Sequence, residues 1–205
     1  MRRNHLFGTS AAGAAVALAV AGLVIAAVPQ TIVVDGANDF LAANLVDADG
    51  GDTQHVPIDL DSVFITNDSN KLYIGFGYDK DGWTNNQLGI AISTGQTGGT
   101  TDPWGHAIAW NTAPHKPDYH AYCNMDNSWQ ELRQWNGGTT SWDLIYSGTG
   151  SLGWVNNTGF EEVGFALSDL GLTAGDTVYI EIISTQNGGT KGPLDLVAGD
   201  AEQLS

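Results

Sequence analysis

Tryptophan residues in polar loops offer the clearest chemistry in this sequence. Three of its seven tryptophans lie in short turn-forming runs of Asp, Asn, Gly, Pro and Ser: Trp83, Trp104 and Trp129. Such surroundings favour the surface over the core. An indole ring stacks on the apolar C–H face of a pyranose, while nearby polar groups bind the hydroxyls. Asn85, Asn86 and Asp126 lie close by in the sequence, so these six residues form the predicted carbohydrate-binding set.

Other tryptophans fit packing roles instead. Trp110 shares a predicted strand face with Ile108. Trp135 and Trp142 flank the turn 136–141, where they can pair across a hairpin. The alternative for the whole set is that every tryptophan packs in the core or across strands, and that no ligand stacks on any of them.

Motifs of catalysis are absent from the sequence. It holds no Gly-x-Ser-x-Gly elbow, no His-Glu-x-x-His pair and no phosphate-binding glycine loop. A glycosidase needs two carboxylates that face each other across a cleft, whereas adjacent Glu161 and Glu162 point to opposite faces of a strand. The prediction is a non-catalytic protein. The alternative is an Asp-based hydrolase, since any two of the many aspartates could meet in the fold.

An acidic segment from Asp47 to Asp52 has the oxygen ligands that Ca²⁺ prefers. It is not an EF-hand, because Gly51 precedes Asp52 and Ile58 stands where the twelfth-position Glu belongs. Loop carboxylates can still gather a calcium ion, and the alternative is a solvated acidic turn. The predicted structural Ca²⁺ site has five aspartates: Asp47, Asp49, Asp52, Asp59 and Asp61.

The single cysteine and the scattered histidines do not indicate a metal or redox centre. Cys123 alternates with His120 and Tyr122, so we expect a small buried strand residue. A nucleophilic thiol would need an electropositive pocket, which an acidic chain does not favour. Structural zinc needs four ligands, and His115 and His120 with one thiol do not supply them.

Net charge excludes one class of partner. The sequence carries 7 Lys and Arg against 23 Asp and Glu, a formal charge of −16. Nucleic-acid binding needs clustered Lys and Arg against phosphates, so no nucleic-acid partner is expected. An acidic, Trp-rich and Lys-poor exterior is compatible with neutral sugars and divalent cations.

The N-terminus resembles a secretory signal peptide over residues 1–28. Arg2 and Arg3 precede an uncharged stretch rich in Ala, Val and Gly that ends near Ala26 and Ala27. The remaining segment, 31–205, suits a single β-sandwich domain. The apolar stretch of about 18 residues is also just long enough to cross a bilayer, so an uncleaved membrane anchor is the alternative. Both interpretations place the rest of the chain outside the cytoplasm, secreted or at the cell surface.

Short β-strands separated by turn clusters of Asn, Asp and Gly are predicted along the rest of the sequence. Many short strands at close spacing are typical of an antiparallel sandwich or barrel. The predicted fold class is therefore all-β, an antiparallel β-sandwich of jelly-roll or immunoglobulin-like form. The expected strands are Thr31–Val34, Ser62–Thr66, Leu72–Tyr78, Leu88–Ser93, His106–Trp110, Tyr119–Asn124, Glu131–Trp135, Trp142–Ser147, Gly159–Ala166 and Thr177–Ser184.

Asp59–Asp79 has the pattern of a β-hairpin around the turn Asn67–Lys71. Alternation with period two places one set of apolar side chains toward the core: Leu72, Ile74, Phe76 and Tyr78.

The one helical signal is Leu167–Leu172, where Ser168 could cap a single turn and Gly171 could end it. No convincing strand pattern follows Ser184, which suggests a truncated piece of a longer protein.

Several segments resemble the extracellular β-sandwich superfamily of family 9 carbohydrate-binding modules and DOMON domains. They are the hairpin Asp59–Asp79, the opening Ile32–Gly36 and the run Ala166–Asp176. The middle region is similar to C-terminal modules of secreted α-glucan-degrading enzymes, through Asp102–Ile108, Pro117–Tyr119, Trp135–Gly137 and Ser141–Trp142. The resemblance spans roughly residues 32 to 184 and implies a jelly-roll-like sandwich that binds carbohydrate, often with structural calcium. Some members bind haem through His and Met, but Met125 is the one methionine beyond the signal segment, so haem is not expected.

Together these features predict a secreted, non-catalytic module that binds a neutral polysaccharide or oligosaccharide by tryptophan stacking. We expect it to belong to a larger polysaccharide-active or cell-surface protein. The alternative from another class is a structural or adhesive extracellular surface domain that binds no sugar.

Overall fold

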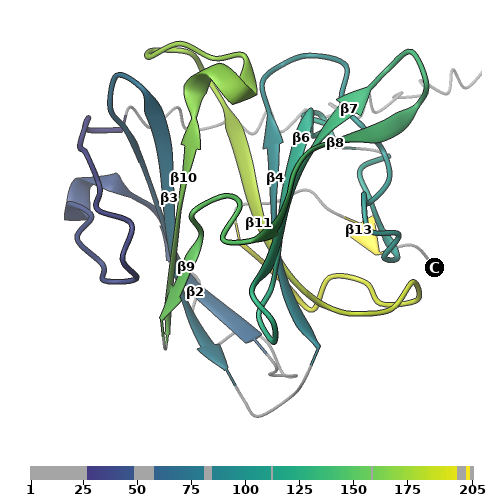
Figure 1. Cartoon of the computed structure of the whole chain (residues 1–205), viewed down its shortest axis with the longest axis horizontal. Coiled ribbons are helices and arrows are strands. Elements are labelled where there is room, and N and C mark those ends of the chain that lie inside the picture. The colour runs from purple at the N-terminus through teal and green to yellow at the C-terminus, as the bar shows by residue number, and fades with distance from the viewer. Residues whose placement is uncertain are drawn as a thin grey trace, which may run out of the picture.

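Two antiparallel β-sheets packed against each other make up most of the described structure (Figure 1). The computed structural model describes residues 27–48, 58–80, 85–111, 113–157, 159–197 and 202–203. The first sheet contains, in spatial order, β1 (Leu45–Ala48), β2 (Ile58–Asn67), β3 (Lys71–Lys80), β10 (Phe160–Ala166) and β9 (Val155–Asn157). The second contains β12 (Asp195–Val197), β11 (Tyr179–Gln186), β4 (Asn86–Ser93), β6 (Tyr119–Asn124), β7 (Trp129–Asn136) and β8 (Ser141–Thr149). A small ladder pairs β5 (Ile108–Ala109) with β13 (Glu202–Gln203). The predicted all-β antiparallel sandwich is confirmed.

The core lies between the two sheets, and the predicted hairpin forms one side of it. β2 pairs with β3 from Ile58↔Lys80 to Asn67↔Leu72, around the expected turn. The four residues predicted to face inward are all buried in the core cluster: Leu72, Ile74, Phe76 and Tyr78. They share that cluster with inward residues of β4, β6 and β11. Burial of each large apolar side chain contributes roughly 1.5–3 kcal/mol, so the alternation determines which face of β3 lies inside.

The outer face of the first sheet is covered as well. The segment that precedes β1 crosses this face, and its Ile32 and Phe40 pack on Tyr73 of β3. A Cβ atom on Gly75 would lie 2.4 Å from a ring carbon of Phe40, so a residue with a side chain would have to displace that ring. Tyr73 is therefore buried although it points away from the main core.

The strand predicted at Thr31–Val34 is wrong. These residues lie outside the sheets and form part of the covering segment. The reason lies in the hydrogen bonds at the end of the run. The main-chain N–H groups of Asp35 and Gly36 donate to the Glu162 carboxylate at 2.9 and 2.7 Å, in place of a neighbouring strand.

A strand does follow Ser184, contrary to the expectation from sequence. β12 pairs with β11 through Ile182↔Val197, Ile183↔Leu196 and Ser184↔Asp195. A strand of three residues is too short to show a recognisable alternation of apolar and polar side chains in the sequence. The strand predicted at His106–Trp110 is shortened to β5, because residues 102–106 form a loop organised by Asp102.

The predicted helical turn is present as a 3₁₀ helix, η2 (Leu167–Leu170), between β10 and β11. Gly171 ends it with a φ of 64°, in the left-handed region that favours glycine. The predicted cap is wrong: Ala166 precedes the helix, and no side chain caps it. A second 3₁₀ helix, η1 (Ala42–Asn44), precedes β1. Among the described residues, no helix has the length and apolar character needed to cross a membrane.

The connection between β4 and β6 lies on the outer face of the second sheet, on the right in Figure 1. Its Ile108, Trp110 and Ala113 pack on Ala91 of β4 and Ile183 of β11. This packing holds the preceding loop, residues 101–106, beside β6 and β7. The candidate site lies there.

Candidate functional site

The outer face of β6 and β7 carries a row of polar and aromatic side chains. The antiparallel register places three pairs side by side: Asn124 with Trp129, Tyr122 with Glu131, and His120 with Arg133. Their neighbours Ala121, Cys123 and Leu132 point the other way, into the core. Alternation along the two strands therefore gathers this chemistry on one face.

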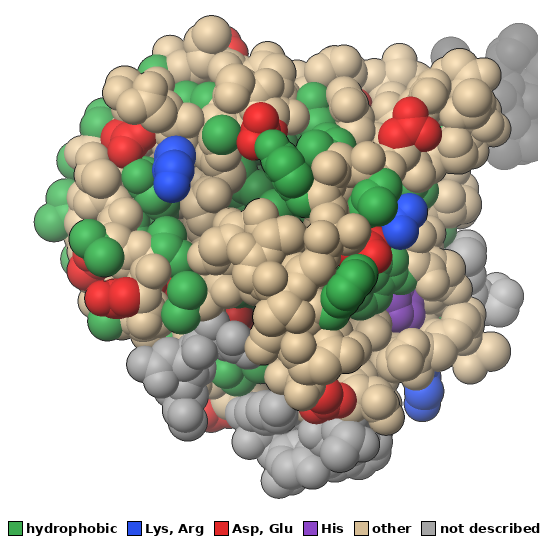
Figure 2. Space-filling view, in the orientation of Figure 1, with side chains coloured by type: hydrophobic (Ala, Val, Ile, Leu, Met, Phe, Trp, Pro, Cys, Tyr) green, Lys and Arg blue, Asp and Glu red, His purple; other side chains and the backbone are tan. Residues whose placement is uncertain are grey.

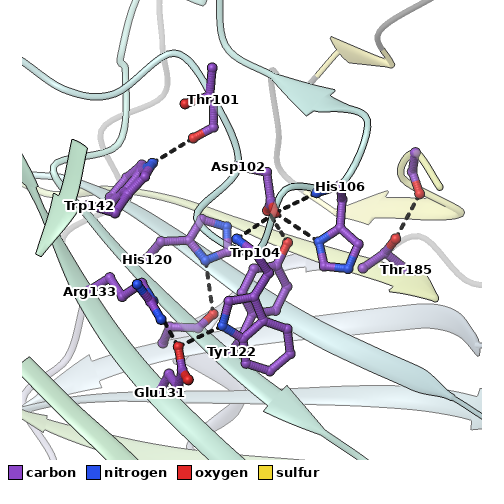
Figure 3. Close-up of polar contacts among 12 residues, drawn as sticks. Thr101, Asp102, Trp104, His106, His120, Tyr122, Glu131, Arg133, Trp142 and Thr185 are labelled. Atoms are coloured by element: carbon purple, nitrogen blue, oxygen red, sulfur yellow. Dashed lines mark hydrogen bonds and ion pairs between the residues drawn. The ribbon is translucent and has the colours of Figure 1, made fainter. Parts of the chain in front are cut away.

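Glu131 joins two of the predicted tryptophans. The Nε1–H of Trp104 donates to its Oε2 at 2.7 Å, and the Nε1–H of Trp129 donates to its Oε1 at 3.0 Å. The Nε of Arg133 forms an ion pair with the same carboxylate at 2.7 Å. Figure 3 shows Glu131 between Arg133 and the indole of Trp104. We call Trp104, Trp129, Glu131 and Arg133 the aromatic platform.

The aromatic platform is partly exposed, and its one negative charge is paired with one positive charge. Trp129 is 41% exposed, and the side chain of Arg133 is 25% exposed. Partial burial would raise the pKa of Glu131, but hydrogen bonds from Arg133, Trp104 and Trp129 outweigh it and hold that pKa below its ordinary value. Glu131 is therefore ionised at neutral pH and its charge is offset by Arg133.

Trp104 lies flat on a buried tyrosine. Its indole stacks on the ring of Tyr122, with centroids 4.5 Å apart and planes 19° from parallel. One face of the indole is thus occupied by the protein, and the indole as a whole is half-buried. A ligand would meet the remaining face of Trp104 and the more exposed ring of Trp129.

Beneath the platform lies a buried polar layer that includes Asp102, His106, His120 and Tyr122. Asp102 accepts a hydrogen bond from Nδ1 of His106 at 2.8 Å and another from the Tyr122 hydroxyl. Burial opposes ionisation of Asp102, but the hydrogen bonds from His106 and from the Tyr122 hydroxyl help to hold its pKa below the ordinary value. Complete burial lowers the pKa of His120 to about 4, and Asp102 only partly opposes this shift.

Of the three predicted polar partners, two lie at the surface and one is buried. The main-chain N–H of Asn85 donates to the Asp126 carboxylate, which brings these two exposed residues together at the turn before Trp129. Asn86 is fully buried, and its carbonyl accepts the N–H of Met125. Its side chain is not presented at the surface beside the platform. Trp83 lies outside the described residues.

The tryptophans assigned to packing have that role. Trp110 is buried against Ala91 and Ile183. Trp135 pairs with Trp142 across the β7–β8 hairpin, with ring centroids 5.4 Å apart. Cys123 is a buried strand residue as predicted, and burial, with the charge of Glu161, raises the pKa of its thiol well above the ordinary range.

The predicted calcium ligands do not converge in the part of the chain that the structure describes. Asp47 accepts the N–H of the adjacent Ala48, and Asp61 accepts the hydroxyl of Ser62. Asp59 is buried on β2. Among the described residues, no group of three His, Cys, Asp or Glu is placed to hold a metal ion. Asp49 and Asp52 lie outside those residues, so a calcium site would depend on them.

Glu161 and Glu162 lie on opposite faces of β10, as predicted. Glu161 accepts the indole N–H of Trp154 in the core, and Glu162 binds the main chain of Asp35 and Gly36 on the outside. They cannot act together across a cleft.

Reasoning from sequence missed Glu131, Arg133 and Tyr122. A signal for the first two was present, because Trp129, Glu131 and Arg133 alternate and must share a face of any strand that includes them. Tyr122 had no such signal, since its contact with Trp104 forms only in the folded chain.

Comparison with known proteins adds no assignment. The sequence matches no protein-family model and no curated protein. The resemblance to carbohydrate-binding modules therefore stays a prediction.

Proposed function

We propose that this chain is a non-catalytic module that binds a neutral carbohydrate on the aromatic platform. The observation that carries the proposal is the single carboxylate of Glu131, which receives the indole N–H of both Trp104 and Trp129. Two indoles whose polar edges converge on one acceptor leave apolar ring surface around a polar centre. A sugar ring has the matching pattern, with C–H faces and a rim of hydroxyls.

The polar groups of the platform suit hydroxyl recognition. Glu131 is an ionised acceptor, and the two Nη groups of Arg133 carry four further N–H donors beyond its Nε contact. A hydroxyl both donates and accepts, so adjacent hydroxyls could bind one residue each. Asn85 and Asp126 stand at the neighbouring turn and could extend these contacts.

Charge supports a neutral ligand over a polyanion. In Figure 2, red acidic side chains are scattered over the visible face and blue basic ones are sparse. The formal charge of −16 would repel a polyanionic chain at distances set by ionic strength. The signal-like N-terminus and the resemblance to secreted modules support an extracellular location, as part of a larger polysaccharide-active or cell-surface protein.

Affinity electrophoresis against soluble glucans and xylans tests the proposal. We expect a neutral glycan to retard the wild-type protein, and Trp129→Ala to weaken that binding by about tenfold or more. Because Trp129 is 41% exposed, its removal should change the melting temperature little.

The matched control is Tyr179→Ala. Tyr179 lies on β11 and is 44% exposed, and its ring stacks on that of His115 with centroids 3.4 Å apart. Two strands, β4 and β6, separate β11 from β7, which carries Glu131. This variant should bind as the wild type does. A folded wild-type protein that no neutral glycan retards would contradict the proposal and favour a structural or adhesive surface domain.

A further inference from the structure

The loop that carries Trp104 is organised by one buried carboxylate. The side chain of Asp102 has no exposed surface, and its Oδ2 accepts the main-chain N–H of Trp104 at 2.8 Å and of His106 at 2.9 Å. The same oxygen accepts Nδ1 of His106 at 2.8 Å. Figure 3 shows Asp102 at the centre of these contacts.

The other oxygen of Asp102 reaches the sheet. It accepts the hydroxyl of Tyr122, a buried residue of β6. Burial, with the charge of Asp102, raises the pKa of Tyr122 well above its ordinary value, so the phenol stays protonated and donates. Trp104 stacks on this same tyrosine ring. Both the main chain and the ring plane of Trp104 are therefore set relative to the Asp102–Tyr122 pair.

Few other main-chain bonds hold the loop. Within the described structure the main-chain N–H of Gly105 donates to Asp102 O at 3.3 Å, that of Asp102 donates to Ile108 O at 3.2 Å, and the indole N–H of Trp142 donates to Thr101 O at 2.7 Å. None of these bonds involves the main chain of Trp104. Its position thus depends on the Asp102 carboxylate, the Tyr122 ring and the Glu131 contact at the far edge of the indole.

We propose that Asp102 and Tyr122 are positioning residues, which hold the Trp104 indole in its ligand-binding orientation before a ligand arrives. Preorganisation matters because a platform that must be ordered on binding loses affinity to the entropy of ordering. The importance of this arrangement for affinity rests on the proposed function. The arrangement itself can be tested without any ligand.

The test is ¹⁹F NMR of protein labelled with 5-fluorotryptophan, in which Trp104→Phe assigns the Trp104 resonance. We expect Tyr122→Phe, which keeps the ring and removes the hydroxyl, to shift or broaden that resonance. Asp102→Asn should do so more strongly. Where a neutral glycan binds the wild type, both variants should bind that glycan about three- to tenfold more weakly.

Asp118→Asn is the matched control. Asp118 is also buried, and its carboxylate accepts the main-chain N–H of Thr94 and Gln96 at the start of the same connection, without touching Trp104. It should destabilise the fold and leave the Trp104 resonance in place. A Trp104 resonance that is unchanged in Tyr122→Phe, or changed equally in Asp118→Asn, would overturn the inference. If no glycan binds the wild type, the proposed function fails, and the ¹⁹F result still decides this point.

Discussion

The outer faces of the two sheets both carry aromatic side chains, yet they differ in what lies around them. On the first sheet, Phe40 packs on Tyr73 and over Gly75, and its ring lies 5.7 Å from that of Phe64. On the second sheet, Trp104 and Trp129 donate to a carboxylate that an arginine also binds. Aromatic residues surrounded by apolar groups close one face, whereas those joined by charged groups leave indole surface exposed on the other.

If the proposed function holds, this difference separates the residues that stabilise the fold from those that bind a ligand. The first face buries apolar surface and contributes free energy of folding. The second keeps one half-buried and one exposed indole over a buried polar layer, an arrangement that stabilises less per residue and would suit binding. The comparison therefore predicts that substitutions on the first face lower stability, whereas substitutions in the aromatic platform weaken ligand binding.

The largest expected effect is loss of stability from Phe40→Ala. Removing a buried phenylalanine ring typically costs about 3–5 kcal/mol of unfolding free energy, measurable by urea denaturation. Gly75→Ala sharpens the result. Its new Cβ would clash with Phe40 in the wild type, so it should destabilise less when Phe40 is already alanine. Additive effects of the two changes would contradict the close contact.

Acid should lower the stability of the folded protein, because His120 on the second sheet is buried in its neutral form. Its pKa is about 4 in the folded protein and about 6.5 when unfolded, so the unfolded state binds the proton more readily. The contribution of neutral His120 to the free energy of unfolding is complete above pH 6.5. It falls by about 3 kcal/mol as the pH drops toward 4, since each pKa unit corresponds to about 1.4 kcal/mol. Denaturation of His120→Gln across this range should show a smaller fall than the wild type. Equal slopes for the two proteins would argue against a buried neutral histidine.

Calcium should have the smallest effect, on the first sheet alone. Asp47, Asp59 and Asp61 lie on β1 and β2, far in the fold from the platform. A weak site that also used Asp49 and Asp52 would stabilise by about 1.4 kcal/mol at ten times its Kd. Melting with and without a chelator measures this directly. An unchanged midpoint would remove calcium from the account.

Local patterns predicted much of the fold and part of the site. The alternation of Leu72 to Tyr78 was sufficient for the hairpin, because period two and a polar turn determine both strands and their inward face. Turn-forming neighbours correctly set Trp104 and Trp129 apart from Trp110. These signals lie within a few residues of one another.

Contacts between distant segments were beyond local reasoning. Trp104 and Glu131 are 27 residues apart in the chain, and only the packing of the β4–β6 connection brings them together. Asn86 was expected at the surface, but β4 is covered on both faces, so the residue is buried. Asp102 has its contacts because it is buried beside Tyr122, which lies 20 residues further along the chain.

The central claim is that recognition belongs to the platform and stability to the closed face. Its most direct test is the affinity of Trp129→Ala and of Phe40→Ala for the neutral glycan that the wild type binds, measured below both melting temperatures. The account predicts about tenfold weaker binding for Trp129→Ala at an unchanged melting temperature, and wild-type affinity for the less stable Phe40→Ala. Wild-type affinity in Trp129→Ala, or binding lost in a folded Phe40→Ala, would contradict it.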